Sequence, residues 1–158
     1  MVGYAEAIDA WLDADVSPLD AASGVASGGP ITWAARAYDV DLLYDTTMHG
    51  FPVGVRAVLR ADCRRLLYEW RACEILLRIT SDRQTGRHEL FGQVLLGGLP
   101  IAAAAVQVGS VEAETPDLSV AMADHGGYFR LAALPSGGYG MRVAVPGAVL
   151  VIPPVIIN

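Results

Sequence analysis

Few residues in this chain have the types and spacing that chemistry requires. Asp124-His125 places an acid beside an imidazole, but no serine or cysteine stands at a spacing that suggests a catalytic triad. Because Asp124 precedes Gly126-Gly127, its carboxylate is better suited to capping a turn. A hydrolase would need the fold to bring His125 together with His49 and His88. We therefore expect the chain not to be an enzyme.

Cys63 and Cys73 are the two cysteines of the chain. Thiols in a chain without a leader are expected to be reduced. A disulfide between the two cysteines remains an alternative if the strands around them pair. Metal binding would need further ligands at a matched spacing, and the three histidines supply none nearby. We expect no metal, no cofactor and no small-molecule ligand.

Composition and charge argue against two classes of partner. The 158 residues are 53% hydrophobic and 18% charged, so a core can be buried, and the net charge is −6. Nucleic acids and anionic membranes attract basic surfaces, so we expect neither as a partner.

Met1 leads into Glu6, Asp9 and Asp13 without a basic or apolar leader, and glycines and prolines interrupt the uncharged runs, so neither a signal peptide nor a membrane span is expected. The sequence therefore predicts a cytoplasmic protein.

Residues 1–14 are predicted to form a short amphipathic helix. Four large apolar residues fall at i, i+4, i+7 and i+8, which puts them on one stripe. They are Tyr4, Ile8, Trp11 and Leu12. Because so short a helix is marginal alone in water, the stripe packs either on its own domain or in a partner's groove. Residues 15–30 are rich in Ser, Ala and Gly, which predicts a flexible linker.

The densest basic cluster is Arg64-Arg65, with Arg60 and Arg71 nearby. Such clusters in strand hairpins are usually solvated faces or protection of a sheet edge. Beside Tyr68 and Trp70, a row of guanidinium groups can also clamp the carboxylates of a partner. Arg64 and Arg65 therefore join the N-terminal stripe as candidate partner-binding residues.

Residues 31–86 are predicted to form a β-rich extension. The expected strands are 40–44, 53–59, 65–70 and 73–80. In the last of these Ile75, Leu77 and Ile79 share one face, and Arg71-Ala72 makes a tight connection before it. Residues 31–38 fit either a short helix or an entry strand, and the pattern does not decide between them.

From residue 87 onward, turn signals recur about every ten residues, as in a β-sandwich. Glycine pairs and prolines separate the predicted strands 88–96, 103–108, 118–123, 128–131, 139–145 and 149–152. We expect the sandwich to occupy 87–158, with the extension packed on it. Pro153-Pro154 is predicted to bend or end the last strand and, because proline has no N–H, to mark a sheet edge.

This region resembles a known domain family. Gly92-Gln-Val, Pro100-Ile-Ala and Ala105-Val-Gln-Val are similar to the first half of the carboxypeptidase regulatory-like domain. Ala123-Asp-His-Gly-Gly-Tyr-Phe-Arg-Leu and Leu134-Pro-Ser-Gly-Gly-Tyr resemble the turns of its second half. The resemblance covers about 90–151 and implies a transthyretin-like (prealbumin-like) Greek-key β-sandwich. It implies little about activity, because this domain is a stabilising or contact module of many unrelated proteins.

Residues upstream extend the resemblance. Leu42-Leu-Tyr-Asp-Thr-Thr, Gly54-Val-Arg, Arg65-Leu-Leu-Tyr-Glu and Ile75-Leu-Leu-Arg-Ile look like those of small bacterial proteins that carry this domain at the C-terminus. Such proteins are often found with sigma factors or caspase-like CHAT proteins. The resemblance therefore implies a role in a regulatory complex.

We expect a non-enzymatic intracellular adaptor or scaffold that binds another protein. One alternative is a self-assembling subunit that pairs through a sheet edge, for which the uncharged segment 149–157 is the candidate. Another is a carbohydrate-binding module. Its stacking platform would have to come from Trp11, Trp33 and Trp70, which are dispersed along the chain.

Overall fold

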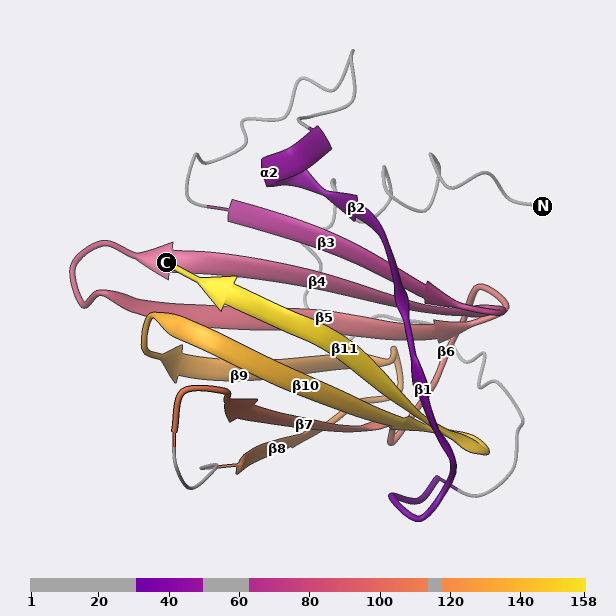
Figure 1. Ribbon diagram of the computed structural model, residues 1–158. Helices are drawn as coiled ribbons and strands as arrows, with labels where there is room; N and C mark the ends of the chain where they lie inside the picture. Colours follow the sequence, from indigo (N-terminus) through magenta and orange to yellow (C-terminus); the bar gives the residue numbers. More distant parts are fainter. Residues whose placement is uncertain (1–30, 50–62, 114–117) are drawn as a thin grey trace.

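Two β-sheets pack face to face in the computed structural model, which describes residues 31–49, 63–113 and 118–158 (Figure 1). The predicted mainly β, sandwich-like class is confirmed in this part of the chain. The predicted N-terminal helix 1–14, the linker 15–30 and the strand 53–59 lie outside the described residues.

The six-stranded sheet has the order β2-β3-β4-β5-β6, and β9 also pairs with β5. Its strands are β2 (Asp41–Asp45), β3 (Cys63–Trp70), β4 (Cys73–Asp82), β5 (Arg87–Leu96), β6 (Leu99–Pro100) and β9 (Tyr128–Leu134). The β4–β5 ladder runs from Cys73↔Leu96 to Asp82↔Arg87. The hairpin expected in the extension therefore shares one sheet with the first strand of the expected sandwich.

The five-stranded sheet has the order β1-β11-β10-β7-β8. Its strands are β1 (Ala37–Asp39), β11 (Ala148–Ile157), β10 (Gly137–Val145), β7 (Ala105–Ser110) and β8 (Leu118–Met122). β1 runs parallel to β11, so the undecided segment 31–38 ends in an entry strand. The chain then crosses to the other sheet through Val40, and β2 is followed by the short helix α2 (Thr46–His49).

The core lies between the inner faces of the two sheets. In β4, Ile75, Leu77 and Ile79 point inward, as their alternation predicts, and all three are buried. The opposite sheet contributes Val106, Val108, Met141, Val143, Leu150 and Ile152. Full burial of one such side chain stabilises the fold by about 1.5–3 kcal/mol.

The turn before β9 forms as its sequence predicts. Asp124 Oδ1 accepts hydrogen bonds from the backbone N–H groups of Gly126 and Tyr128, at 2.8 and 2.9 Å, so its role as a turn cap is confirmed. Gly127 has φ +72°, and a Cβ there would lie 2.4 Å from the Val94 carbonyl oxygen. Glycine is required at this position on both counts.

Pro153-Pro154 does not end the last strand, because β11 continues to Ile157, and the predicted bend takes the form of an irregularity in the ladder. The β10–β11 ladder pairs Tyr139 with Val155 and Met141 with Ile152, which leaves Gly140 opposite both prolines in a β-bulge. A bulge interrupts the ladder, so residues without an N–H are tolerated there. β11 is paired on both sides over 149–151, whereas among the described residues its proline-containing end pairs only with β10, in agreement with the predicted edge.

Candidate functional site

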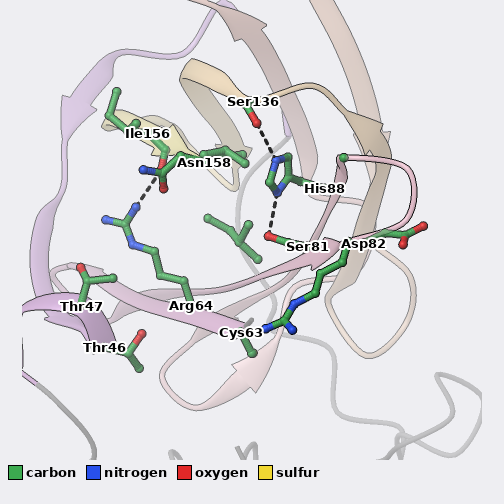
Figure 2. Close-up of a pocket in the computed structure, with 14 residues that line it drawn as sticks. Thr46, Thr47, Cys63, Arg64, Ser81, Asp82, His88, Ser136, Ile156 and Asn158 are labelled. Carbon is green, nitrogen blue, oxygen red and sulfur yellow. Dashed lines mark hydrogen bonds between the residues drawn. The ribbon is translucent and has the colours of Figure 1, made fainter. Parts of the chain in front are cut away.

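A pocket of about 560 Å³ lies at one end of the sandwich (Figure 2). It is formed by α2, the start of β3, the end of β4, the start of β5, the β9–β10 turn and the end of β11. Its polar lining includes Thr46, Arg64, Ser81, Arg83, His88 and Ser136. Hydroxyl, guanidinium and imidazole groups converge here, and such groups are typical of binding and catalytic sites.

Arg64 is held inside the pocket by two partners. Its Nε and Nη2 donate to the two carboxylate oxygens of Asp45 at 3.2 and 2.6 Å, and its Nη1 donates to the Ile156 backbone oxygen at 2.7 Å (Figure 2). Asp45 is only 1% exposed and also accepts hydrogen bonds from the backbone N–H and the hydroxyl of Thr47. The guanidinium therefore ties β2 and β3 to β11 across the two sheets.

The electrostatics of this pair favour its charged form. Burial acts to raise the pKa of Asp45, but hydrogen bonds from Arg64 and Thr47 outweigh it and hold that pKa below its usual value. The hydrogen bond to Asp45 raises the pKa of Arg64, against the opposing effect of burial. Arg64 is thus a charged cross-link of the fold.

His88 connects three segments through its imidazole ring. The residue is 5% exposed, and its Nδ1 and Nε2 each lie 2.9 Å from a hydroxyl oxygen, of Ser81 and Ser136 respectively (Figure 2). A neutral imidazole donates at one nitrogen and accepts at the other, so two hydroxyls satisfy it. Both distances suit a serine nucleophile and its base, but neither partner is a carboxylate that would stabilise a protonated ring. The arrangement favours a clamp between β4, β5 and the β9–β10 turn.

The other histidines do not extend this cluster within the described residues. His125 lies in the turn before β9, where the Gly126 oxygen accepts a hydrogen bond from Gln93, on the half of β5 away from His88. The side chain of His49 is outside the description. Among the described residues, no three His, Cys, Asp or Glu side chains lie close enough to hold a metal ion.

The two cysteines are far apart although the strands around them pair. Cys63 stands opposite Thr80 and Cys73 opposite Trp70, at the two ends of the β3–β4 hairpin. At about 3.3 Å per residue, they are on the order of 20 Å apart, beyond the reach of a disulfide. Both thiols are free, and burial, with a smaller effect of the Glu74 carboxylate, raises the pKa of Cys73 to about 12.

The predicted basic cluster is divided between two faces of β3. Arg64 points towards β11, whereas Arg65 stands opposite Arg78 on the outer face of the six-stranded sheet. The two arginines therefore do not form one row. The stripe of Tyr4, Ile8, Trp11 and Leu12 lies outside the described residues, so its role stays a prediction.

Two of the three tryptophans are described, and they occupy different surfaces. Trp33 lies over the five-stranded sheet, with the Arg142 guanidinium 5.8 Å from its ring. Trp70 packs against Tyr38 with the two rings tilted and their centroids 4.6 Å apart, and the Arg71 guanidinium lies over the Trp70 ring. These two indoles do not form a shared platform for a sugar.

The open edge formed by β8 is a feature that the sequence reasoning missed. β8 pairs with β7 on one side and has no hydrogen-bonded strand on the other among the described residues. Leu118, Val120 and Met122 project from its outer face and are 49%, 57% and 59% exposed. The inner positions are the small residues Ser119 and Ala121. The apolar residues at i, i+2 and i+4 indicate in the sequence that three side chains share one face of a strand. Only the folded structure shows that this face is exposed to solvent.

The rest of that outer face is partly covered. Ile31 and Ala35 pack on a small cluster of Ala105, Ala144 and Val149. The cover stops short of β8, because Met122 stands directly opposite Ala105 in the ladder and is still exposed. The apolar row of β8 is therefore the uncovered margin of this sheet.

No family model, curated protein or solved structure matches the chain. Within the described residues, every helix is too short or too polar to cross a lipid bilayer.

Proposed function

We propose that this chain is a non-enzymatic protein-binding module, an adaptor or scaffold, which captures an extended segment of a partner by strand addition to β8. One observation carries the proposal: the row of Leu118, Val120 and Met122 is exposed on a strand that has no charged residue and no described neighbour on one side. Strand addition gains affinity from main-chain hydrogen bonds and specificity from alternate side chains.

The edge lacks the devices that usually protect such strands. Natural edges carry lysines, prolines or bulges that prevent pairing with another chain. β8 consists of Leu-Ser-Val-Ala-Met, and its ladder to β7 is regular from Met122 to Leu118. A fitting partner segment has apolar residues at alternate positions and no proline where it must donate to β8.

The polar groups of the pocket support a binding role over a catalytic one. Arg64 is paired with Asp45, and both nitrogens of His88 are satisfied by serine hydroxyls. A catalytic group needs capacity to bind or exchange protons with a substrate. Here that capacity is used within the fold.

The proposal includes the family and setting that the sequence implies. It treats 87–158 as a carboxypeptidase regulatory-like, transthyretin-like sandwich of a cytoplasmic bacterial protein, in a complex of the CHAT or sigma-factor-associated type.

A capture experiment with paired variants tests the proposal. Tagged wild-type chain, Val120→Lys and the control Met48→Lys are used in parallel pull-downs from the native host. Both replaced side chains are exposed, so both variants should fold, as thermal unfolding would verify. We expect one stoichiometric protein with wild type and the control but not with Val120→Lys, and new hydrogen-exchange protection in 118–122 in the purified complex. Equal capture by all three chains would contradict strand addition at β8.

Self-assembly through the same edge is the second candidate function. The sequence Leu118-Ser-Val-Ala-Met122 is nearly symmetric about Val120, so two copies can pair antiparallel with Leu118 opposite the partner copy's Met122. A two-fold axis would then extend the apolar row across both copies. Light scattering after size exclusion decides: a dimer that becomes a monomer in Val120→Lys favours this function, and a monomeric wild type excludes it.

A further inference from the structure

The outer face of the six-stranded sheet carries an apolar surface of its own. On β3 and β4 the side chains that alternate with the core residues are directed away from the other sheet, and Leu67 stands opposite Leu76. The same cross-strand row continues through Gln93 on β5 to Tyr128 on β9. Phe91 lies beside this row and stacks on Tyr128, with ring centroids 5.5 Å apart.

This apolar surface is shielded from water. Leu67 and Leu76 are only 6% and 4% exposed, although they belong to neither core cluster. A sheet face that nothing covers leaves its side chains in contact with solvent, as the β8 row shows. On the other sheet, Ala144 and Val149 are similarly buried on the outer face because Ile31 and Ala35 pack on them.

The described residues do not supply an equivalent cover for Leu67 and Leu76. Apart from the two sheets, they contain one helix, α2, which lies beside β2 and β3 (Figure 1). The Nε atom of Arg78, on the same face, is buried and has no hydrogen-bond acceptor among the described residues. Burial also raises the pKa of Glu74, with a further effect of Glu69, at the other end of this face. Apolar and charged groups on this face are therefore buried, although no described element lies over them.

We propose that the N-terminal segment 1–14 packs in cis on this face, with its stripe of Tyr4, Ile8, Trp11 and Leu12 against Leu67, Leu76 and Phe91. The segment has the amphipathic pattern that such a surface requires, with large apolar residues at helical spacing. This inference is independent of the proposed function, because it concerns the other sheet.

Charge favours this segment over 50–62, the other long apolar stretch outside the description. Residues 1–14 contain Glu6, Asp9 and Asp13 and no basic residue, whereas 50–62 carries Arg56 and Arg60 and one acidic residue, Asp62. The face presents Arg65 and Arg78 side by side, and Arg78 also lies over Phe91 at 4.9 Å. The acidic side chains of 1–14 would complement these guanidinium groups at the Arg65–Arg78 end of the face, which is the end away from Glu69 and Glu74.

Chain length permits the arrangement. Ile31, the first described residue, bridges to Pro146 in the turn between β10 and β11. Residues 15–30 can span on the order of 50 Å when extended, and the two sheets of a sandwich are only about 10 Å apart. The linker is therefore long enough to bring 1–14 around to the far face.

The fluorescence of Trp11 tests this proposal in the full-length chain. Replacing Trp33 and Trp70 by phenylalanine leaves Trp11 as the single indole reporter. We expect blue-shifted emission and slow acrylamide quenching, both independent of protein concentration. Leu76→Arg should shift the emission to the red and accelerate quenching several-fold, because it places a charge under the stripe. Val120→Arg, on the other sheet, should change neither.

Arg78→Glu is a second variant that keeps the apolar surface and reverses the charge. It should also increase quenching of Trp11, by a smaller factor, and it covers the case in which Leu76→Arg does not fold. The proposal is overturned if Trp11 is solvent-exposed in the reporter chain, or if folded face variants leave its quenching unchanged. Protection that appears only at high concentration would overturn it too, because a second copy would then be the occupant.

Discussion

Arg64 and Asp45 form an ion pair across β3 and β2 in which the carboxylate is nearly inaccessible, with a side chain 2% exposed. A second pair, Arg130 with Glu89, joins β9 to β5 on the surface, where the side chains are 64% and 38% exposed. Both link neighbouring elements of one sheet, but they differ in solvent contact. Comparing the stability lost when each pair is broken therefore distinguishes a buried cross-link of the fold from a surface contact.

Arg64→Met should destabilise the chain far more than Arg130→Met. Loss of one partner of a fully buried pair costs about 3–5 kcal/mol, and we expect about 2 kcal/mol or more here because Arg64 is partly exposed. The exposed pair is expected to contribute less than about 1 kcal/mol. Urea unfolding of both variants measures the difference. Equal unfolding midpoints would show that the pocket pair contributes no more than the surface pair.

The Asp45 carboxylate should also make the stability of the chain sensitive to acid. Because the pKa of Asp45 is lowered in the fold, its ionised form stabilises the native state above its ordinary pKa, and this contribution is lost as the pH falls through the folded value. The free energy of unfolding of the wild type should therefore fall below about pH 4 more steeply than that of Asp45→Asn. Identical pH slopes for the two chains would exclude Asp45 as a source of acid sensitivity.

Gly127→Ala should be strongly destabilising, and Gly147→Ala should not. Both glycines have positive φ, +72° and +74°, so each substitution incurs a left-handed backbone cost of about 1–2 kcal/mol. At Gly127 the new methyl group would also meet the Val94 carbonyl oxygen at 2.4 Å, whereas at Gly147 nothing lies within 4 Å. Thermal unfolding of the matched pair isolates the steric part. A similar loss in both variants would contradict the close packing of this turn.

The thiols should react at very different rates. Cys73 is buried and its pKa is raised to about 12, so almost no thiolate is present at neutral pH, and Cys63 is more accessible. Alkylation of the native chain followed by mass spectrometry should give one rapid modification, at Cys63, and a second only after denaturation. Cys63→Ser should then remove the rapid phase. Rapid modification of Cys73 in the folded chain would show that β4 opens at its start.

Local patterns were sufficient to predict much of the β structure. Alternation in Ile75, Leu77 and Ile79 identifies both the strand and its inner face, and Asp124 with Gly127 identifies a turn. These signals work because side-chain direction and backbone φ are properties of a few neighbouring residues. The sandwich-like class follows from the number and spacing of such strands.

The pairings that define the candidate sites depend on residues far apart in the sequence. The prolines of β11 are accommodated by a bulge opposite Gly140, which no inspection of 149–157 alone could show. Likewise, the partner of Arg64 is 19 residues upstream, and His88 is held by Ser136, 48 residues downstream. Val120 is exposed because the residues that cover this face, Ile31 and Ala35, pack on Ala105, Ala144 and Val149 and not on β8. Each of these is a consequence of how distant segments pair and pack.

The parallel pairing of β1 with β11 also bears on the order in which the chain can assemble. β1 is the first described strand and β11 the last, and their ladder joins Ala37 to Val149. During synthesis on a ribosome, β1 therefore cannot pair with β11 until nearly all of the described chain has been made. Contacts between such distant segments slow folding, so closure of the five-stranded sheet is expected to be a late step in folding.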